Sequence, residues 1–469
     1  MRSRKRRLAA IALVLVLGVL AALAPIRPAN AASKVRLSKT SLTFKSDKAK
    51  AQTITVKGIK KSNIKEMTIQ NYAETYISVK QKGKNKIVVK PLRSSDDITS
   101  PIYVTVEFKK PIKGDYRAYL SVEKLKVKGK SKIAVKTADE LASLLPHCTR
   151  NRWTYYLAND IDMTGRGFIN YSYADLNIDG KGHKIISDGP VFGEFSGKMK
   201  NVIFECNYDI APSKNSIVNE LLSSYKEIAP VLQLETGSTM TGCKSTGTIK
   251  INFDEDLEDS NITVAGLLGT NDYTSKVVGC KSEVDISITG ADKYKIHALW
   301  VGGIVATNNN NAELRESEFA GKITVDYNWP SVGGICQFND TAGKIYDCLM
   351  TGAVNSGQDY PCAAIVANGS GEFCLVERVL SIGSADAQIF SRVVDEDDVE
   401  NKQLPAFKDV YYLTSKADAV KYRDKAFEIP GVHGITETEL LAQATFEGFD
   451  FTKVWEMGAN GPKLRNVID

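Results

Sequence analysis

Four short apolar segments recur along the sequence at nearly constant spacing, and they restrict the possible folds more than any other feature. The segments are Val264–Leu267, Val301–Ile304, Val332–Ile335 and Cys362–Ile365, which follow one another after 37, 31 and 30 residues. Repeats of this length are typical of solenoids, in which each unit buries its apolar side chains only by stacking on the next. The spacing therefore predicts a stack of similar coils.

Small residues form a second column of the same repeat. They are Cys243, Cys280, Ser317, Cys348 and Val379, each followed four residues later by Gly247, Val284, Gly321, Gly352 and Gly383. Apolar and polar residues then alternate, as they do in short β-strands. We therefore predict coils of parallel strands about 4.8 Å apart, with the cysteines stacked inside as small apolar side chains.

Glycines and asparagines mark the expected corners of each coil. Gly266, Gly303 and Gly334 lie inside the repeated segments, where a sharp turn needs backbone angles closed to most residues. Capping-box spacings at Thr137 and Thr436 predict two short helices that cover the ends of the stack. We expect left-handed turns at Asn271, Asn308, Asn339 and Asn368.

The region from residue 34 to 128 follows a different pattern. Runs such as Thr53–Val56 and Ile102–Val106 alternate between polar and apolar residues and are separated by polar turns, which predicts an antiparallel β-sandwich. The expected fold class is therefore all-β. It consists of an N-terminal sandwich followed by a right-handed parallel β-helix with short capping helices.

The repeat resembles the GLUG-type repeat of bacterial surface β-helices, a family also found as an accessory region in immunoglobulin A peptidases and large adhesins. Leu37–Phe44 resembles the first strand of bacterial immunoglobulin-like domains, Tyr156–Met163 an entry coil, and Phe449–Trp455 a terminal segment. The resemblance implies an immunoglobulin-like sandwich over 34–128, a β-helix with GLUG-like repeats over 133–395, and a C-terminal cap over 396–469. It implies an architecture rather than an activity.

The first 31 residues predict export. A basic head, an apolar run over Leu8–Leu23 and the small residues Ala29–Ala31 form a signal peptide, with an uncleaved anchor as the alternative. We therefore expect an extracellular or cell-surface location and no intracellular partner.

Charge is divided unevenly behind this segment. Residues 34–130 contain 24 Lys and Arg against 8 Asp and Glu, a net charge of +16, whereas residues 131–469 carry −16. Such asymmetry usually reflects binding partners. We expect residues 34–130 to contact an anionic polymer, with simple solubility as the alternative.

Candidate sites are few, and we predict no catalytic, cofactor or metal site. Cys243, Cys280 and Cys348 would form a metal site or disulfide ladder only if they were not ordinary core residues. The acidic run Asp254–Asp259 is either a calcium ligand or a solvated loop. A platform for stacking on sugar rings, or else corner packing, is predicted for Trp300, Trp329, Tyr294 and Tyr327.

Together these features predict a secreted or cell-surface protein that is not an enzyme. Its solenoid would bind a cell-wall, host glycan or protein surface, and its Lys-rich module an anionic polymer. The first alternative is a polysaccharide lyase or hydrolase on the same scaffold, and the second is a structural stalk with no ligand. The enzyme alternative requires carboxylates from at least two coils to converge in a groove, about 5 to 10 Å apart.

Overall fold

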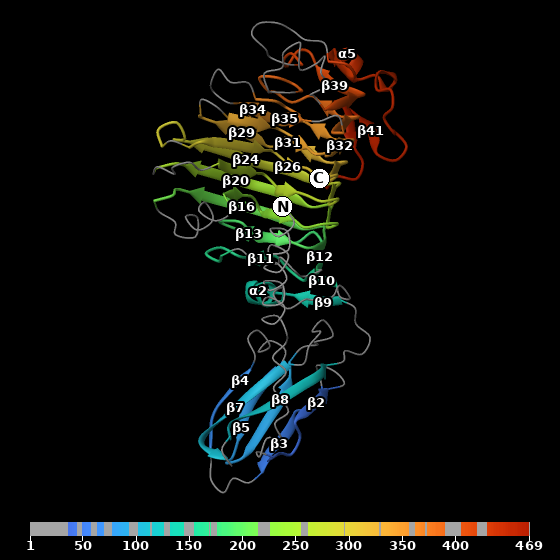
Figure 1. Cartoon of the computed structure of the whole chain (residues 1–469). Coiled ribbons are helices and arrows are strands. Elements are labelled where there is room, and N and C mark those ends of the chain that lie inside the picture. The colour runs from blue at the N-terminus through green and yellow to red at the C-terminus, as the bar shows by residue number, and fades with distance from the viewer. Residues whose placement is uncertain are drawn as a thin grey trace, which may run out of the picture. The chain divides into compact units, whose positions relative to one another are not determined.

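The chain divides near residue 128 into two compact units (Figure 1). The computed structural model describes residues 36–468 except 45–48, 58–62, 70–76, 93–101, 113–114, 126–131, 145–153, 168, 170–175, 214–225, 255–260, 295, 328–329, 356–361, 371–372, 390–404 and 420–428. The predicted signal peptide and residues 126–131, where the chain passes from one unit to the other, lie outside these residues. Among the described helices, none is long and apolar enough to cross a membrane.

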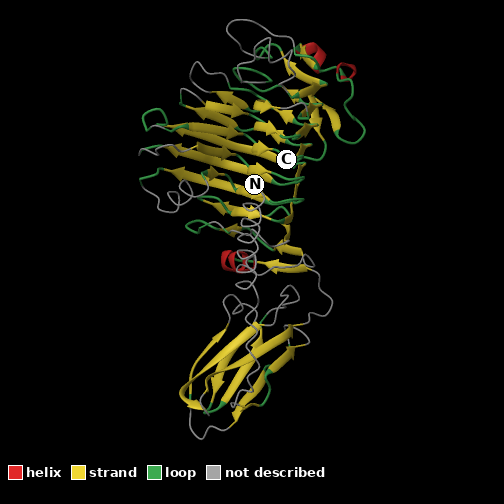
Figure 2. Cartoon of the chain, viewed as in Figure 1, coloured by secondary structure: helices red, strands yellow, loops and turns green. Residues whose placement is uncertain are grey.

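Two four-stranded sheets form the described part of the N-terminal unit (Figure 2). Alternation places Ile54, Val89 and Val104 inside, where they are fully buried. All strand pairs are antiparallel except β2 with β8. One sheet contains β1 (Arg36–Leu37), β3 (Gln52–Lys57), β6 (Lys86–Pro91) and β5 (Ile77–Lys82), and the other β2 (Ser41–Phe44), β8 (Asp115–Leu125), β7 (Ile102–Ile112) and β4 (Ile64–Ile69).

Four parallel sheets form the solenoid of the second unit, and the central coils of the chain have a strand in each of them. Sheet I contains β9 (Lys132–Val135), β10 (Thr154–Leu157), β12 (Leu176–Asp179), β15 (Gly197–Lys200), β19 (Thr239–Thr241), β23 (Lys276–Val278), β27 (Glu313–Arg315), β32 (Lys344–Tyr346), β36 (Leu375–Glu377) and β38 (Ala406–Lys408). Sheet II contains β11 (Ile161–Asp162), β13 (Lys184–Ser187), β16 (Ile203–Ile210), β20 (Lys244–Asn252), β24 (Lys281–Thr289), β28 (Glu318–Phe319), β29 (Lys322–Val325), β33 (Leu349–Met350), β34 (Ala353–Asn355), β37 (Leu380–Ser381), β39 (Val410–Leu413) and β40 (Val432–Ile435).

The other two sheets are shorter. Sheet III contains β14 (Phe192–Phe195), β18 (Val231–Leu234), β22 (Leu268–Asn271), β26 (Val305–Asn308), β31 (Cys336–Asp340) and β35 (Val366–Ser370). Sheet IV contains β17 (Glu227–Ile228), β21 (Asn261–Ala265), β25 (Ala298–Gly302) and β30 (Pro330–Gly333). A typical coil therefore runs from β23 through β24, β25 and β26 to β27. The all-β, β-helix-like architecture predicted from the repeat is confirmed.

Strand pairing follows the spacing of the sequence repeat. Val264 pairs with Val301, and Val301 with Val332, one coil further on. The last repeated segment joins the same stack through a bridge between Gly333 and Ala363. Matching positions of successive repeats are thus spatial neighbours.

The repeated glycines form a tight corner between sheets IV and III. A Cβ atom on Gly303 would lie 2.0 Å from the carbonyl oxygen of Gly334 and 2.6 Å from the Phe319 ring. At Gly266 the corresponding distance to the Gly303 oxygen is 2.2 Å. The corner faces the inner side of sheet II, so no side chain fits there. None of Gly266, Gly303 and Gly334 has a positive φ, so our prediction that backbone angles require glycine was wrong; the close approach of neighbouring atoms requires it instead.

Asparagines form a buried ladder rather than the left-handed turns that we predicted. Asn271 donates from Nδ2 to Oδ1 of Asn308 at 2.7 Å, and Asn308 donates likewise to Asn339 at 2.8 Å. None of the three has a positive φ; the left-handed residues come two or three positions later, as at Asn310 and Asn311. The prediction was wrong because the amides satisfy one another inside the stack instead of bending the chain.

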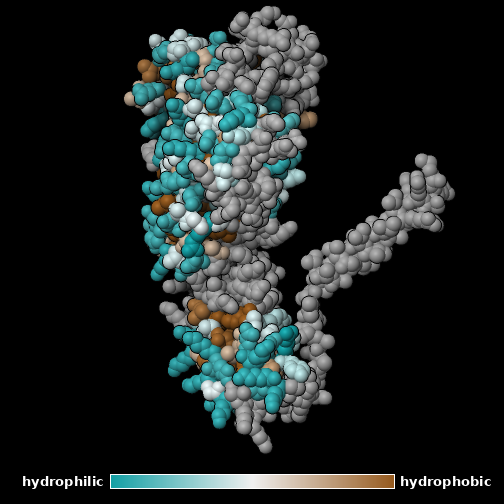
Figure 3. Space-filling view, turned by 90° about the vertical axis from the view of Figure 1, so that its left-hand side faces the viewer, coloured by the Kyte–Doolittle hydropathy of each residue, from teal (hydrophilic) through white to brown (hydrophobic). Residues whose placement is uncertain are grey.

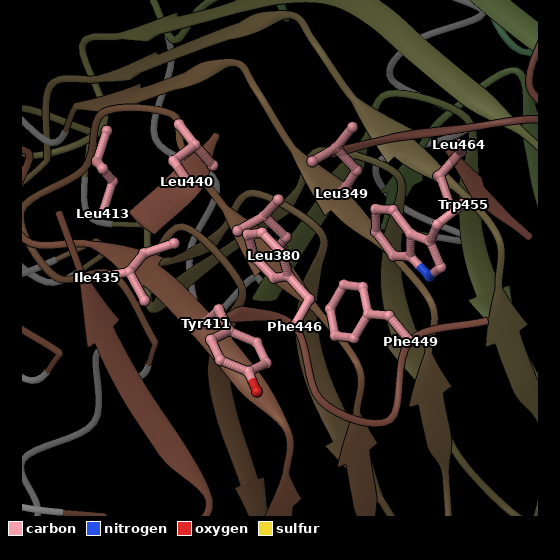
Figure 4. Close-up of a cluster of buried hydrophobic side chains, with 10 residues drawn as sticks. All are labelled: Leu349, Leu380, Tyr411, Leu413, Ile435, Leu440, Phe446, Phe449, Trp455 and Leu464. Atoms are coloured by element: carbon pink, nitrogen blue, oxygen red, sulfur yellow. The ribbon is translucent and has the colours of Figure 1, made fainter. Parts of the chain in front are cut away.

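The C-terminal segment packs on the outer face of sheet II (Figure 4). Outer positions along one column of this sheet change from the charged Lys244, Lys281 and Glu318 to the apolar Leu349 and Leu380. On this apolar part lies an aromatic cluster that includes Phe446, Phe449 and the fully buried Trp455, and Figure 4 shows these side chains directed toward one another. The indole nitrogen of Trp455 donates to Oδ1 of Asp347 at 3.1 Å.

Short helices lie at the two predicted positions. Helix α2 (Ala138–Leu144) begins after Thr137, whose hydroxyl accepts from the amide of Glu140 at 3.1 Å. Helix α5 (Glu437–Leu440) has the complete capping box of Thr436 and Glu439. It is followed by the 3-10 helix η3 (Gln443–Thr445) and a hairpin of β41 (Trp455–Gly458) and β42 (Gly461–Leu464).

Candidate functional site

A shallow groove of about 450 Å³ opens on the outer face of sheet II. Two columns of outward residues border the groove. Pairing in successive coils forms the first column from Lys322, Ala353 and Ser384. The second column lies beside it and consists of Ala320, Thr351 and Ile382. The groove therefore runs along the stacking direction, across three coils. Lys416, in the turn after β39, forms part of its rim.

Stacked glycines form the floor of this groove. A Cβ on Gly321 would lie 2.1 Å from the Val284 oxygen, and one on Gly352 would lie 2.2 Å from the Gly321 oxygen. Gly383 repeats the same contact with Gly352 at 2.2 Å. Glycine is thus required by coil stacking, and the result is a floor without side chains on which a flat polar ligand can lie close to the backbone.

Polar groups surround the floor. The Asp285 carboxylate accepts from the amide of Lys322 at 3.0 Å, and the Thr351 hydroxyl donates to Glu318 at 2.8 Å. In the described part of the chain, no ion pair includes the ammonium group of Lys322 or Lys416. The lining of the groove therefore contains two lysines, Lys322 and Lys416, together with the Asp285 carboxylate.

A ladder of ion pairs lies beside the groove, on the same outer face of sheet II. Lys244 and Lys281 each lie 3.0 Å from the Glu283 carboxylate, and Lys281 lies 3.5 Å from Glu318. Burial acts to raise the pKa of Glu283, but hydrogen bonds and charge from the two lysines outweigh it and lower that pKa. These charges neutralise one another, so the ladder adds no net charge beside the groove.

The predicted sugar-stacking residues do not form one platform. Tyr327 is buried, and its hydroxyl donates to the Ile296 carbonyl at 2.8 Å, so its ring cannot present a face to a ligand. This part of the prediction is wrong because strand alternation directs Tyr327 inward. Tyr294 is partly exposed, with the Lys293 ammonium 4.8 Å above its ring. Trp329 lies outside the described residues.

Trp300 lies at an outer position of sheet IV, in the crease between sheets IV and III. Hydrogen bonds cross this crease in other coils, from Thr270 to Glu227 at 2.9 Å and from Gln337 to Ser331 at 2.9 Å. Burial raises the pKa of Glu227 to about 7, although the Thr270 hydroxyl opposes the shift. The crease is therefore bridged by side chains, and half-buried Trp300 packs within it.

Three acids of successive coils lie toward the end of sheet III. Glu194 follows Phe192 in β14, Glu235 follows β18, and Asp272 follows β22 one coil further on. Burial raises the pKa of Glu235, and the charges of Glu194 and Asp272 raise it further. The acids thus come from more than one coil, which is one of the two features that the enzyme alternative required.

The cysteine column lies in the interior. The Cys243 amide donates to Sγ of Cys280 at 3.4 Å, and the Cys280 amide donates to Oγ of Ser317 at 3.1 Å. Burial raises the pKa of the Cys348 thiol. The described cysteines are buried and form no disulfide with one another.

The acidic run is only partly described. Asp254 accepts from the amide and hydroxyl of Ser213, and residues 255–259 lie outside the described part of the chain. No group of three described His, Cys, Asp or Glu side chains is arranged to hold a metal ion.

Sequence reasoning missed the residues of the groove. Lys322, Asp285 and Lys416 share no motif, and they become neighbours only through coil pairing. The recurrence of Gly321, Gly352 and Gly383 was the available signal, because glycines at one column of a solenoid indicate a place where backbones approach closely.

Comparison with known proteins gives a weak likeness among solved structures. No family model matches the chain, and no curated protein matches it. A solved structure from Bacteroides ovatus, described as "a putative immunoglobulin A1 protease", matches 71% of this chain and 92% of its own at 14% identity and a TM-score of 0.32. The similarity is too low to transfer any activity.

One prediction must nevertheless be corrected. The sequence led us to predict that the chain is not an enzyme, and the description of this neighbour as a protease contradicts that prediction. We therefore do not retain it.

Proposed function

We propose that this chain is an exported binding protein whose solenoid holds an acidic oligosaccharide of a cell-wall or host surface in the groove of sheet II. The observation that carries the proposal is the open groove itself, which has a glycine floor and the rim cations Lys322 and Lys416. Coils about 4.8 Å apart match the length of one sugar ring in an extended chain. One ring can therefore lie over each of the three coils, with two of the three carboxylates directed to Lys322 and Lys416.

The N-terminal unit is proposed to contact an anionic polymer through its excess of lysines. Its two packed sheets support the proposal that it is an immunoglobulin-like module. The repeated segments and their in-register stacking support assignment of the solenoid to the GLUG-type β-helices.

Oligosaccharide binding tests the proposed function. Trigalacturonate and neutral cellotriose are titrated into the mature chain by calorimetry, and into the Lys322→Ala and Ala353→Trp variants. We expect only trigalacturonate to bind, with an affinity at least tenfold weaker in both variants. Lys250→Ala is the control, because it removes one exposed lysine from the same face outside the groove.

Two results would overturn the proposal. One is an equal affinity for the two sugars, since the rim charges would then have no role. The other is an equal loss in the Lys250→Ala control, which would indicate unspecific attraction.

A second candidate function is cleavage of a glycosidic bond at the acid group on sheet III. Retaining enzymes use carboxyl groups about 5 Å apart, and Glu235 and Asp272 lie in adjacent coils. The raised pKa of Glu235 suits a proton donor. The test is release of reducing ends from polygalacturonate and neutral glycans; activity that persists in Glu235→Gln would exclude this pair.

A further inference from the structure

One face of the N-terminal unit carries lysines without acids. In the sheet formed by β1, β3, β6 and β5, alternation directs Ile87 and Val89 into the core, where they are fully buried. The intervening positions face outward. Exposed lysines occupy these outer positions at Lys57, Lys80, Lys82, Lys86 and Lys90.

Pairing concentrates these charges. Lys82 lies directly opposite Lys86, and Lys90 lies opposite Ser78. Like charges at directly opposed positions of an antiparallel pair destabilise the sheet. The turn between β5 and β6 adds Lys84, which is also exposed. Repulsion between these lysines therefore lowers the stability of the N-terminal unit.

Nothing described in this unit neutralises the face. The four strands of the sheet contain no Asp or Glu. The acids of the described strands belong to β4, β7 and β8 of the other sheet, where they are Glu66, Glu107, Asp115 and Glu123. There Glu107 lies 2.7 Å from Arg117 and 3.5 Å from Lys65. Within the described residues, no ion pair includes any of the five lysines. In the view of Figure 3, hydrophilic residues cover much of the described surface of this unit.

We infer that this lysine face docks a flexible linear phosphodiester polymer. This rests on the proposed function, since it assigns the proposed polymer contact to one face and one ligand chemistry. Successive outer residues lie about 6.8 Å apart along a strand and about 4.8 Å apart across strands. That spacing is close to the separation of neighbouring phosphates in an extended chain. Lysine binds phosphate as a mobile point charge and not as a planar fork, which suits a flexible polymer.

Salt-dependent binding of the mature chain tests the inference. The probe is immobilised poly(glycerol phosphate), and the face variant replaces Lys80, Lys82, Lys86 and Lys90 by Gln. Each neutralised phosphate contributes about 0.7 to the slope of log affinity against log salt for single-stranded polymers. Four lost contacts should therefore flatten the slope by about 3, and weaken binding at least tenfold at low salt.

A control with the same net charge separates the face from the total charge. It replaces four exposed lysines of the solenoid, Lys136, Lys198, Lys250 and Lys453, by Gln. We expect this control to keep the slope of the unmodified chain. Thermal unfolding should show the face variant at least as stable as the unmodified chain, because repulsion is removed.

The negative outcomes are distinguishable. If the unmodified chain does not bind poly(glycerol phosphate), the polymer contact in the proposed function fails together with this inference. If it binds but the face variant and the control lose slope equally, only the assignment to this face fails. If the face variant lost binding to duplex DNA but still bound poly(glycerol phosphate), the inference that the partner is a flexible polymer would be wrong.

Discussion

Removal of one rung of the asparagine ladder should open the solenoid locally. In Asn308→Ala the fully buried Asn308 side chain is lost, with its bonds to Asn339 at 2.8 Å and to the Lys344 carbonyl at 3.3 Å. Asn271 also loses its acceptor at 2.7 Å, but it retains the Glu313 carbonyl at 3.2 Å. The oxygens of Asn339 and Lys344 therefore lose a donor in a dry interior.

The magnitude follows from these two groups. A buried polar group left unsatisfied costs about 1 to 3 kcal/mol, so the variant should lose about 3 kcal/mol. Because unfolding of a chain with two units need not be two-state, hydrogen exchange is the suitable assay. Amides of β26 and β31 should exchange about a hundredfold faster, at about 1.4 kcal/mol for each factor of ten.

The control for this experiment is Asn207→Ala, which removes an exposed asparagine from β16. We expect its exchange rates to change less than threefold. If Asn308→Ala exchanges like the control, the ladder does not stabilise the stack and our reasoning about it is refuted.

Three further predictions concern burial and the close stacking of the coils. Folding raises the pKa of Glu227 from 4.5 to about 7, so the folded state binds a proton at this carboxyl more tightly than the unfolded chain does. The resulting contribution to stability is complete below pH about 4.5. About 3 kcal/mol of that stability is lost as pH rises through 7; Glu227→Gln should abolish this dependence in thermal melts from pH 5 to 9. Gly352→Ala places a Cβ 2.2 Å from a backbone oxygen and should destabilise the chain by about 1 to 3 kcal/mol in urea, and an unchanged midpoint would contradict the tight stacking. Cys348 should resist iodoacetamide at pH 8 until the chain is unfolded, as judged by mass spectrometry, because burial keeps its thiol protonated.

The sequence was sufficient to predict the stacking of the coils. Cys243, Cys280 and Cys348 recur at the repeat spacing, and a solenoid turns such recurrence directly into spatial neighbours. Both capping helices were predictable for a local reason, since a capping box depends on residues three apart. The role of the repeated asparagines could not be predicted in this way, because a buried asparagine ladder and a left-handed turn favour the same residue type.

The candidate site was not predictable because it depends on pairing between coils. Lys322 and Lys416 are 94 residues apart, and no local pattern links them. The lysine face had a clearer signal, since lysines two residues apart in a strand lie on the same side. What the sequence lacked was the pairing that places Lys82 opposite Lys86.

Disulfide trapping tests the register of the coils most directly. Lys250 pairs with Ser287, and Thr289 lies two residues further along the same strand. Paired positions in adjacent coils fall within the Cα distance that a disulfide allows, whereas a shift of two residues exceeds its limit of about 7 Å. Under mild oxidation the account predicts an intrachain disulfide in the Lys250→Cys/Ser287→Cys variant and none in Lys250→Cys/Thr289→Cys. Equal trapping of the two pairs, or preference for the second, would contradict it.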